Sequence, residues 1–133
     1  MVRLTVVNDD REVLDLIGEI LEGGRYATTL IDGAQDDLLQ QICRSEPDLL
    51  MIDLRHGNDA RHGWEIVQQL RTASGCEDLP VLLCSADVAA LREMQPDLEA
   101  TAAVTPLKLP FSIDELLDSI RSLIGGREAP RCS

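Results

Sequence analysis

Apolar and polar positions along the chain form two alternating kinds of pattern. Short apolar runs of strand length occur at residues 4–7, 26–31, 49–52, 81–84 and 102–105. Each run is followed by apolar residues at helical spacing, and the clearest helix begins with the capping-box pair Ser112 and Glu115. Strands that alternate with helices predict an α/β doubly wound sandwich, with a five-stranded parallel sheet covered on both faces.

Polar and proline residues set the expected boundaries. Asp87 is expected to cap a short fourth helix that ends before Pro96, and Trp64 to anchor the third helix in the core. The last helical pattern fades near residue 125. We therefore expect one domain over residues 1–125, followed by a disordered tail or the start of a linker over residues 126–133.

Composition narrows the classes of partner. The 133 residues include 12 Lys+Arg and 24 Asp+Glu, a formal net charge of −12, which argues against nucleic acid and anionic membranes and favours proteins or a cation. No signal peptide or membrane span is recognisable, so a cytoplasmic location is expected. The four cysteines form no CxxC pair, and Cys43 and Cys84 are expected to behave as small buried hydrophobes.

Polar side chains stand where the predicted strands end. In open parallel sheets, ligands bind outside the carboxyl ends of the strands. The residues at those ends are Asn8, Asp9, Asp10, Asp53, Ser85 and Lys108.

These residue types suit one chemistry. Two neighbouring strand ends with carboxylates supply the oxygen ligands that Mg²⁺ prefers, together with waters and a phosphate oxygen. A carboxylate can also attack phosphorus to give an acyl phosphate. A hydroxyl and a cation nearby would hold the transferred group through charge-assisted hydrogen bonds. The residues thus predict a metal-assisted, phosphoryl-accepting site.

Four segments, VVNDDREVLDLI, PDLLMIDL, LPVLLCSA and KLPFSIDELL, resemble the receiver domain of two-component response regulators. Their order and spacing match that family over residues 3–125. The resemblance implies a flavodoxin-like (βα)5 fold with strand order 2-1-3-4-5. It also implies Mg²⁺-dependent phosphoryl transfer to one aspartate from a sensor histidine kinase or a phosphotransfer protein.

The resemblance assigns roles at the first and third strand ends. Asp53 stands where the family has its phospho-acceptor, which also ligates the metal. Asn8 and Asp9 occupy the family's acidic pair, so Asp9 is expected to bind Mg²⁺ directly and Asn8 through water. Asp10 is a further candidate ligand, and the backbone carbonyl of Arg55 is expected to complete the set. Helix capping by Asp9 and Asp10 is compatible with these assignments, since Asp9 and Glu12 form a capping-box-like pair.

The fourth and fifth strand ends are expected to hold the phosphoryl group. Ser85 matches the family's Ser/Thr, and Ala86 the small residue beside it. The family's lysine directly precedes a proline; here Leu109 has that place and Lys108 stands one residue earlier. A shift of one residue turns a strand side chain to the opposite face, so Lys108 reaches the phosphate only if the backbone is irregular.

Other positions also depart from the family. Thr105 and Pro106 replace its conformational-switch aromatic, and the loop after Asp53 is about two residues longer by our alignment. His56 and His62 in that loop do not have helical i, i+4 spacing, so a solvated loop is expected rather than a metal site. Arg55 and Asp87 are expected to face each other across the pocket mouth, with a solvated Arg55 that has no role as the alternative.

The leading hypothesis is a phospho-accepting signalling switch that is not an enzyme. It would bind a kinase or phosphotransfer protein and a downstream effector, with homodimerisation left open. The alternative is a pseudo-receiver, which uses the fold for phosphorylation-independent protein binding. A flavodoxin-like electron carrier would need a hydroxyl-rich phosphate loop, and an aspartate-dependent phosphatase a DxD string; the chain has Asn8-Asp9-Asp10 and Asp53-Leu54-Arg55 there.

Overall fold

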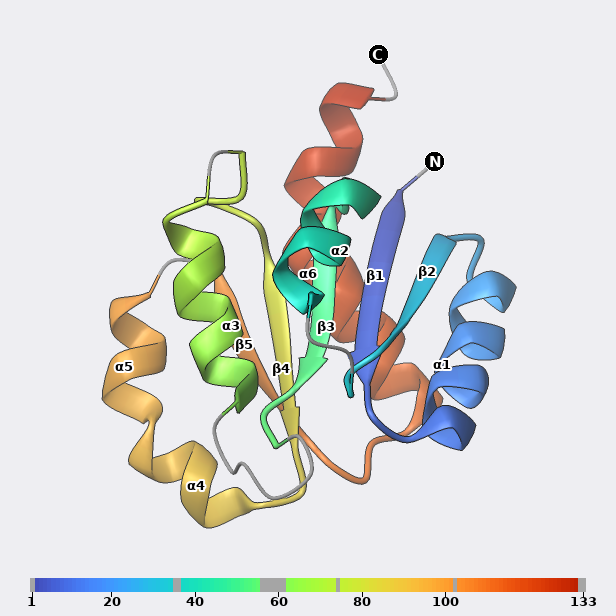
Figure 1. Ribbon diagram of the computed structural model, residues 1–133. Helices are drawn as coiled ribbons and strands as arrows, with labels where there is room; N and C mark the ends of the chain where they lie inside the picture. Colours follow the sequence, from blue (N-terminus) through green and yellow to red (C-terminus); the bar gives the residue numbers. More distant parts are fainter. Residues whose placement is uncertain (1, 35–36, 56–61, 74, 102, 132–133) are drawn as a thin grey trace.

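The computed structural model describes residues 2–34, 37–55, 62–73, 75–101 and 103–131. Its parallel strands form one sheet in the predicted order, β2-β1-β3-β4-β5, which confirms the flavodoxin-like fold (Figure 1). The strands are β1 (Arg3–Asn8), β2 (Ala27–Asp32), β3 (Leu49–Asp53), β4 (Val81–Ser85) and β5 (Val104–Lys108).

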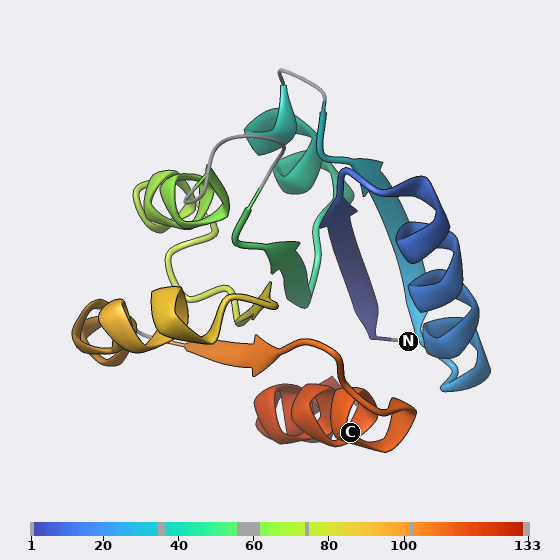
Figure 2. The same cartoon turned by 90° about the horizontal axis from the view of Figure 1, so that it is seen from below.

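Helices cover both faces of the sheet, as Figures 1 and 2 show. They are α1 (Arg11–Gly23), α2 (Leu38–Ser45), α3 (His62–Arg71), α4 (Val88–Glu93), α5 (Gln95–Ala100) and α6 (Ile113–Arg131). Buried side chains of α1 and α6 join one apolar cluster, and those of α2, α3, α4 and α5 join another. The sheet therefore separates two cores.

The apolar strand β3 shows why both faces need cover. Leu50 and Ile52 belong to the core under α2 and α3, whereas Leu49 and Met51 belong to the core under α1 and α6. Successive side chains of a strand leave on opposite faces. A strand without polar alternation is therefore stable only between two layers of helices.

One helix was not predicted. α4 ends at Glu93, before Pro96 as expected, but Pro96 then lies in the first turn of a further helix, α5, where proline's missing N–H costs nothing because that N–H has no intrahelical acceptor. The last helix, α6, continues through Gly125 and Gly126 to Arg131, so it extends into the segment that was expected to be a tail or the start of a linker. Glu128 and Ala129 favour helix, and residues 132–133 lie outside the described part.

Other local predictions were confirmed. The Asp87 side chain caps α4 by accepting the Ala90 N–H at 3.0 Å. Ser112 and Glu115 form the predicted capping box, with hydrogen bonds of 3.0 and 3.3 Å. Trp64 is 8% exposed and packs in the core beneath α3. No helix in the described ranges has the length and apolar character to span a membrane.

Candidate functional site

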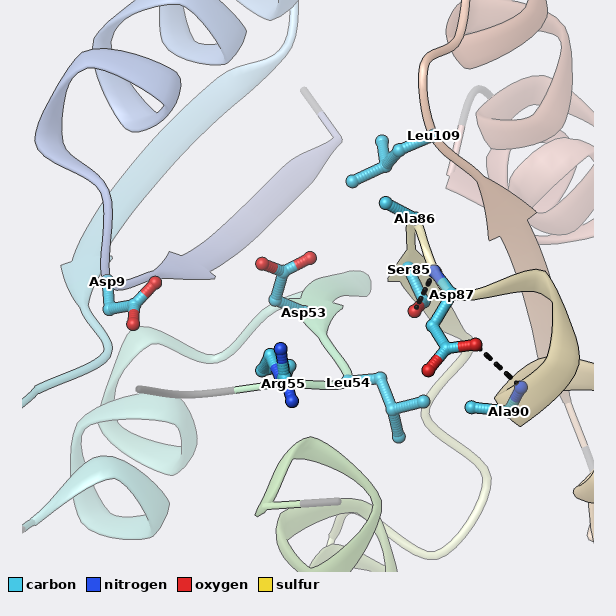
Figure 3. A pocket seen from close by; sticks show the side chains of 9 residues that line it. All are labelled: Asp9, Asp53, Leu54, Arg55, Ser85, Ala86, Asp87, Ala90 and Leu109. Carbon is cyan, nitrogen blue, oxygen red and sulfur yellow. Dashed lines mark hydrogen bonds between the residues drawn. The ribbon is translucent and has the colours of Figure 1, made fainter. Parts of the chain in front are cut away.

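Three neighbouring strands bring the predicted polar residues to one opening. Asp9 follows β1, Asp53 ends β3 and Ser85 ends β4, and β3 lies between β1 and β4 in the sheet. Figure 3 shows the side chains around this opening. The cavity of about 420 Å³ is lined by Asp9, Asp53, Leu54, Arg55, Ser85, Ala86, Asp87, Ala90 and Leu109.

Asp53 is half-buried at the floor of this pocket. Burial, and to a smaller extent the negative charge of Asp9, raise the pKa of its carboxyl group to about 6. The side-chain amide of Asn8 donates a hydrogen bond to Asp53 Oδ2 at 3.3 Å. Asp53 is therefore a carboxylate with both a like charge and a neutral donor beside it.

Replacing Asp53 with asparagine should stabilise the metal-free protein near pH 7. A carboxyl pKa raised to about 6 means that ionised Asp53 costs stability, progressively from about pH 4 to pH 6 and fully above. The difference from the ordinary value corresponds to roughly 3 kcal/mol, and solvent screening in the open pocket reduces the expected gain to about 1–2 kcal/mol.

The measurement is urea unfolding with a chelator present, at neutral pH and at about pH 4, where the gain should disappear. Asp15→Asn is the matched control, because Asp15 lies on the exposed face of α1, 3.9 Å from Arg11. A gain from Asp53→Asn that does not change with pH would contradict the raised pKa as its cause.

Three polar residues, Asn8 at the end of β1 and Asp9 and Asp10 directly after it, have different roles. Asn8 is 7% exposed; its Oδ1 accepts the Asp10 N–H at 2.8 Å, and its amide group points to Asp53. Asp10, and not Asp9, caps α1 by accepting the N–H groups of Glu12 and Val13. Of the two residues considered for helix capping, Asp10 has this role, whereas Asp9 lines the pocket.

Ser85 and Ala86 present donors from the β4 side. Ser85 is 6% exposed, and its Oγ accepts the Asp87 N–H at 3.0 Å, so the hydroxyl proton is left to donate elsewhere. Ala86 lies beside it on the pocket wall (Figure 3). This wall can supply hydrogen bonds to an anionic oxygen.

Arg55 and Asp87 both line the pocket, as expected. Among the described residues, however, no ion pair joins them: the Asp87 carboxylate is engaged at the start of α4. The Arg55 side chain is exposed and lies beside Asp53 (Figure 3). The predicted Arg55–Asp87 pair is thus not formed.

The position of Lys108 corrects one predicted role. Lys108 pairs in register with Ser85, but its side chain lines a separate groove between α4, α5 and β5, together with Arg92 and Glu99. Leu109 is the residue of this segment that lines the pocket. Because neighbouring strand residues point to opposite faces, regular backbone keeps Lys108 away from Asp53.

Gly63, which our sequence reasoning missed, lies directly against the site. A Cβ atom added to Gly63 would be 2.0 Å from the backbone oxygen of Asp53 and 3.0 Å from the Cα of Leu54. Its N–H donates to the Leu54 carbonyl at 3.0 Å. A glycine at the start of a predicted helix, directly before the anchoring Trp64, was the only signal in the sequence.

The predicted loop between Asp53 and α3 falls mostly outside the described residues, including His56. His62 lies in the first turn of α3, and its Nδ1 is 3.9 Å from a Glu65 oxygen. In the part of the chain that the structure describes, no three His, Cys, Asp or Glu side chains are grouped as metal ligands.

The donors in the pocket nonetheless fit Mg²⁺. The Asp9 and Asp53 carboxylates face one cavity, and the charge of one raises the pKa of the other, which is the repulsion that a cation would relieve. Mg²⁺ usually takes one or two carboxylates and keeps several waters. Two carboxylates and a backbone carbonyl such as that of Arg55 are therefore a sufficient protein contribution.

Comparisons with known proteins agree with this fold. Similar solved structures include a sensor protein from Polaromonas sp. JS666, with 24% identity, a TM-score of 0.78 and coverage of 94% of this chain and 97% of that one. A putative response regulator from Chloroflexus aurantiacus has 27% identity and a TM-score of 0.73, with 92% and 97% covered.

The receiver domain of a sensor histidine kinase from Pseudomonas aeruginosa PAO1 has a TM-score of 0.74, 24% identity and coverage of 92% and 97%; it holds a magnesium ion in its active-site cleft. No curated protein matches the chain. The model of the response regulator receiver domain matches residues 4–121. Since that match spans most of the chain and the sheet order agrees with it, this protein belongs to the response regulator receiver domain family.

Proposed function

We propose that this receiver domain accepts a phosphoryl group on Asp53 from a phosphohistidine of a sensor kinase or phosphotransfer protein. The observation that carries the proposal is the meeting of Asp53, Asp9 and Ser85 in one pocket at the carboxyl ends of β1, β3 and β4. An Asp53 oxygen attacks phosphorus, the phosphorus–nitrogen bond breaks, and the imidazole takes up a proton.

The other pocket residues bind and orient the group. The Ser85 hydroxyl and the backbone N–H of Ala86 would donate hydrogen bonds to phosphoryl oxygens. Asp9, Asp53 and the carbonyl of Arg55 would hold Mg²⁺, with Asn8 acting through water. When bound, this ion supplies positive charge that offsets the crowded phosphoryl and carboxylate oxygens. Asp10 is left out, because its side chain already caps α1.

The phosphorylated domain would switch a signalling output by binding a downstream effector protein in the cytoplasm. Receiver domains are signalling modules, and this chain's net charge of −12 suits protein partners better than nucleic acid. The groove that Lys108 lines is separate from the phosphorylation pocket. Lys108 would therefore contribute to partner binding and not to holding the phosphate.

One alternative function has specific support. A pseudo-receiver would use the same fold without phosphorylation, and two features favour it: Leu109 stands in the pocket where the family has a lysine, and the Asn8 amide is bonded to Asp53. Leu109 lacks the positive charge of the family's lysine, and Asn8 lacks the negative charge of the family's acidic residue. Both charges assist phosphorylation in the family.

Incubation with Mg²⁺ and phosphoramidate, followed by intact mass measurement, should show one phosphate on the wild-type protein. The Asp53→Asn variant should show none, because the nucleophilic oxygen is lost. Asp32→Asn is the matched control: Asp32 also ends a strand, β2, but its carboxylate accepts the Ala34 N–H and does not line the pocket. It should be phosphorylated like wild type.

Two outcomes would decide against the proposal. A phosphate that persists on Asp53→Asn would show that another residue is the acceptor. A wild-type protein that stays unmodified, although correctly folded, would establish the pseudo-receiver.

A further inference from the structure

Two cysteine sulfurs from different elements touch at the amino ends of the strands. Cys43 lies near the end of α2, and Cys76 lies in the turn between α3 and β4. Their Sγ atoms are 3.7 Å apart. Asp53 and Ser85 lie at the carboxyl ends of the strands, so this contact is separate from the phosphorylation pocket.

The backbone holds both cysteines in place. The Cys76 N–H donates to the Ala73 carbonyl at 3.1 Å, and the Cys76 carbonyl accepts the Leu79 N–H at 3.3 Å. Arg71 Nη1 donates to the same carbonyl at 3.3 Å. Cys43 belongs to a helix and packs on the same apolar core that contains Cys76. Both cysteines therefore belong to hydrogen-bonded segments that pack on one core.

A disulfide would need only a small movement. Its sulfurs are about 2.05 Å apart, so the contact must close by about 1.6 Å. The residue before Cys76 is Gly75, which is exposed and has φ of +88° with nothing within 4 Å of an added Cβ atom. Glycine lets the turn adjust its backbone at little cost.

We propose that Cys43 and Cys76 are a dithiol that small-molecule disulfides oxidise to a reversible intramolecular disulfide. The Cys43 thiolate attacks the oxidant, forms a mixed disulfide and releases one thiolate. The Cys76 thiolate then attacks Cys43 Sγ and displaces the second. The protein loses two electrons and two protons, and the oxidant becomes two thiols.

Exposure sets the order of these steps. Cys43 is half-buried, whereas Cys76 is 8% exposed, so the oxidant reaches Cys43 first. Burial, and then the hydrogen bond with Cys43, raise the pKa of Cys76 to about 11, so Cys76 is a poor competitor of Cys43 for the oxidant. The pair thus responds to sustained oxidation, as transient disulfides do in reducing compartments.

The disulfide would join α2 to the turn before β4. Because it closes a long stretch of chain, it restricts the unfolded state and should raise the melting temperature by about 5–15 °C. This effect does not require Asp53 to be phosphorylated. A failure of this proposal and a failure of the proposed function are therefore distinguishable.

The test uses the full chain with Cys132→Ser, which leaves three thiols. After glutathione disulfide treatment, acid quenching and denaturation, N-ethylmaleimide should add to one thiol instead of three, and dithiothreitol should restore three. Cleavage with trypsin and Glu-C separates Cys76 from Cys84 at Glu77. The expected product is a peptide of residues 26–44 joined to one of residues 72–77.

Matched serine variants complete the test. Cys76→Ser should keep a glutathione adduct on Cys43, Cys43→Ser should stay reduced at Cys76, and neither should gain thermal stability. The proposal is overturned if the parent protein still adds three maleimides, if a glutathione adduct on Cys43 persists despite Cys76, or if the joined peptide contains Cys84.

Discussion

Asn8→Asp should bind Mg²⁺ about tenfold to a hundredfold more tightly than the wild-type protein. In the wild type, the Asn8 amide donates to Asp53 Oδ2 at 3.3 Å, so a neutral donor faces the proposed metal ligand. An aspartate there would add a third negative charge to the Asp9–Asp53 pair. Without metal, the added repulsion should lower the free energy of unfolding, and Mg²⁺ should more than restore it.

Calorimetric titration measures the affinity, and the fluorescence of Trp64, the chain's single tryptophan, gives a second readout. Asp10→Asn is the matched control, since it changes one charge in the same loop and keeps a residue type that caps helices; its affinity for Mg²⁺ should equal that of wild type. Equal affinities of wild type and Asn8→Asp would contradict the assignment of position 8 to the metal site.

Gly63→Ala should lower the free energy of unfolding by about 3 kcal/mol or more. The new Cβ would be 2.0 Å from the Asp53 backbone oxygen, which is much closer than the van der Waals radii of the two atoms allow. The neighbouring atoms belong to the backbone of Asp53 and Leu54, so no side chain can rotate away. Either α3 or the end of β3 must shift, which also displaces the phospho-acceptor.

Gly23→Ala is the matched control, because an added Cβ at the end of α1 has nothing within 4 Å. It should be neutral or slightly stabilising, since alanine favours helix. Chemical unfolding measures both variants, and intact mass after phosphoramidate treatment reports the acceptor in any Gly63→Ala that folds. A Gly63→Ala protein as stable as wild type would contradict this prediction, because it would show that the start of α3 can shift without cost.

Local sequence patterns predicted most strands and helices, but they predicted less well where the helices begin and end. The runs of the inner strands β1, β3 and β4 were recognisable because buried parallel strands are apolar on both faces. The helix that contains Pro96 and the continuation of α6 beyond Gly125 were not predicted, because proline and glycine only bias a backbone and do not forbid a helix at its first turn or near its end. Their outcome depends on neighbouring residues.

The candidate site was also predicted only in part from the sequence. Asp9, Asp53 and Ser85 were found from the sequence, because strand ends in a parallel sheet share one edge and the topology alone brings them together. The directions in which individual side chains point could not be predicted from the topology. Capping was considered for both Asp9 and Asp10, and only the structure shows that Asp10 caps α1. The Asp87 carboxylate accepts the Ala90 N–H at the start of α4 and does not pair with Arg55.

The sequence by itself determined the fold class, the sheet order implied by the family, the residues at the strand ends and the departures at positions 8 and 109. Only the tertiary structure decided that Lys108 lines another groove, that Gly63 lies against Asp53, and that Cys43 meets Cys76. Periodicity follows from repeating backbone geometry, which a sequence carries locally. Contacts between residues far apart in the chain depend on how whole elements pack, and no local pattern encodes them.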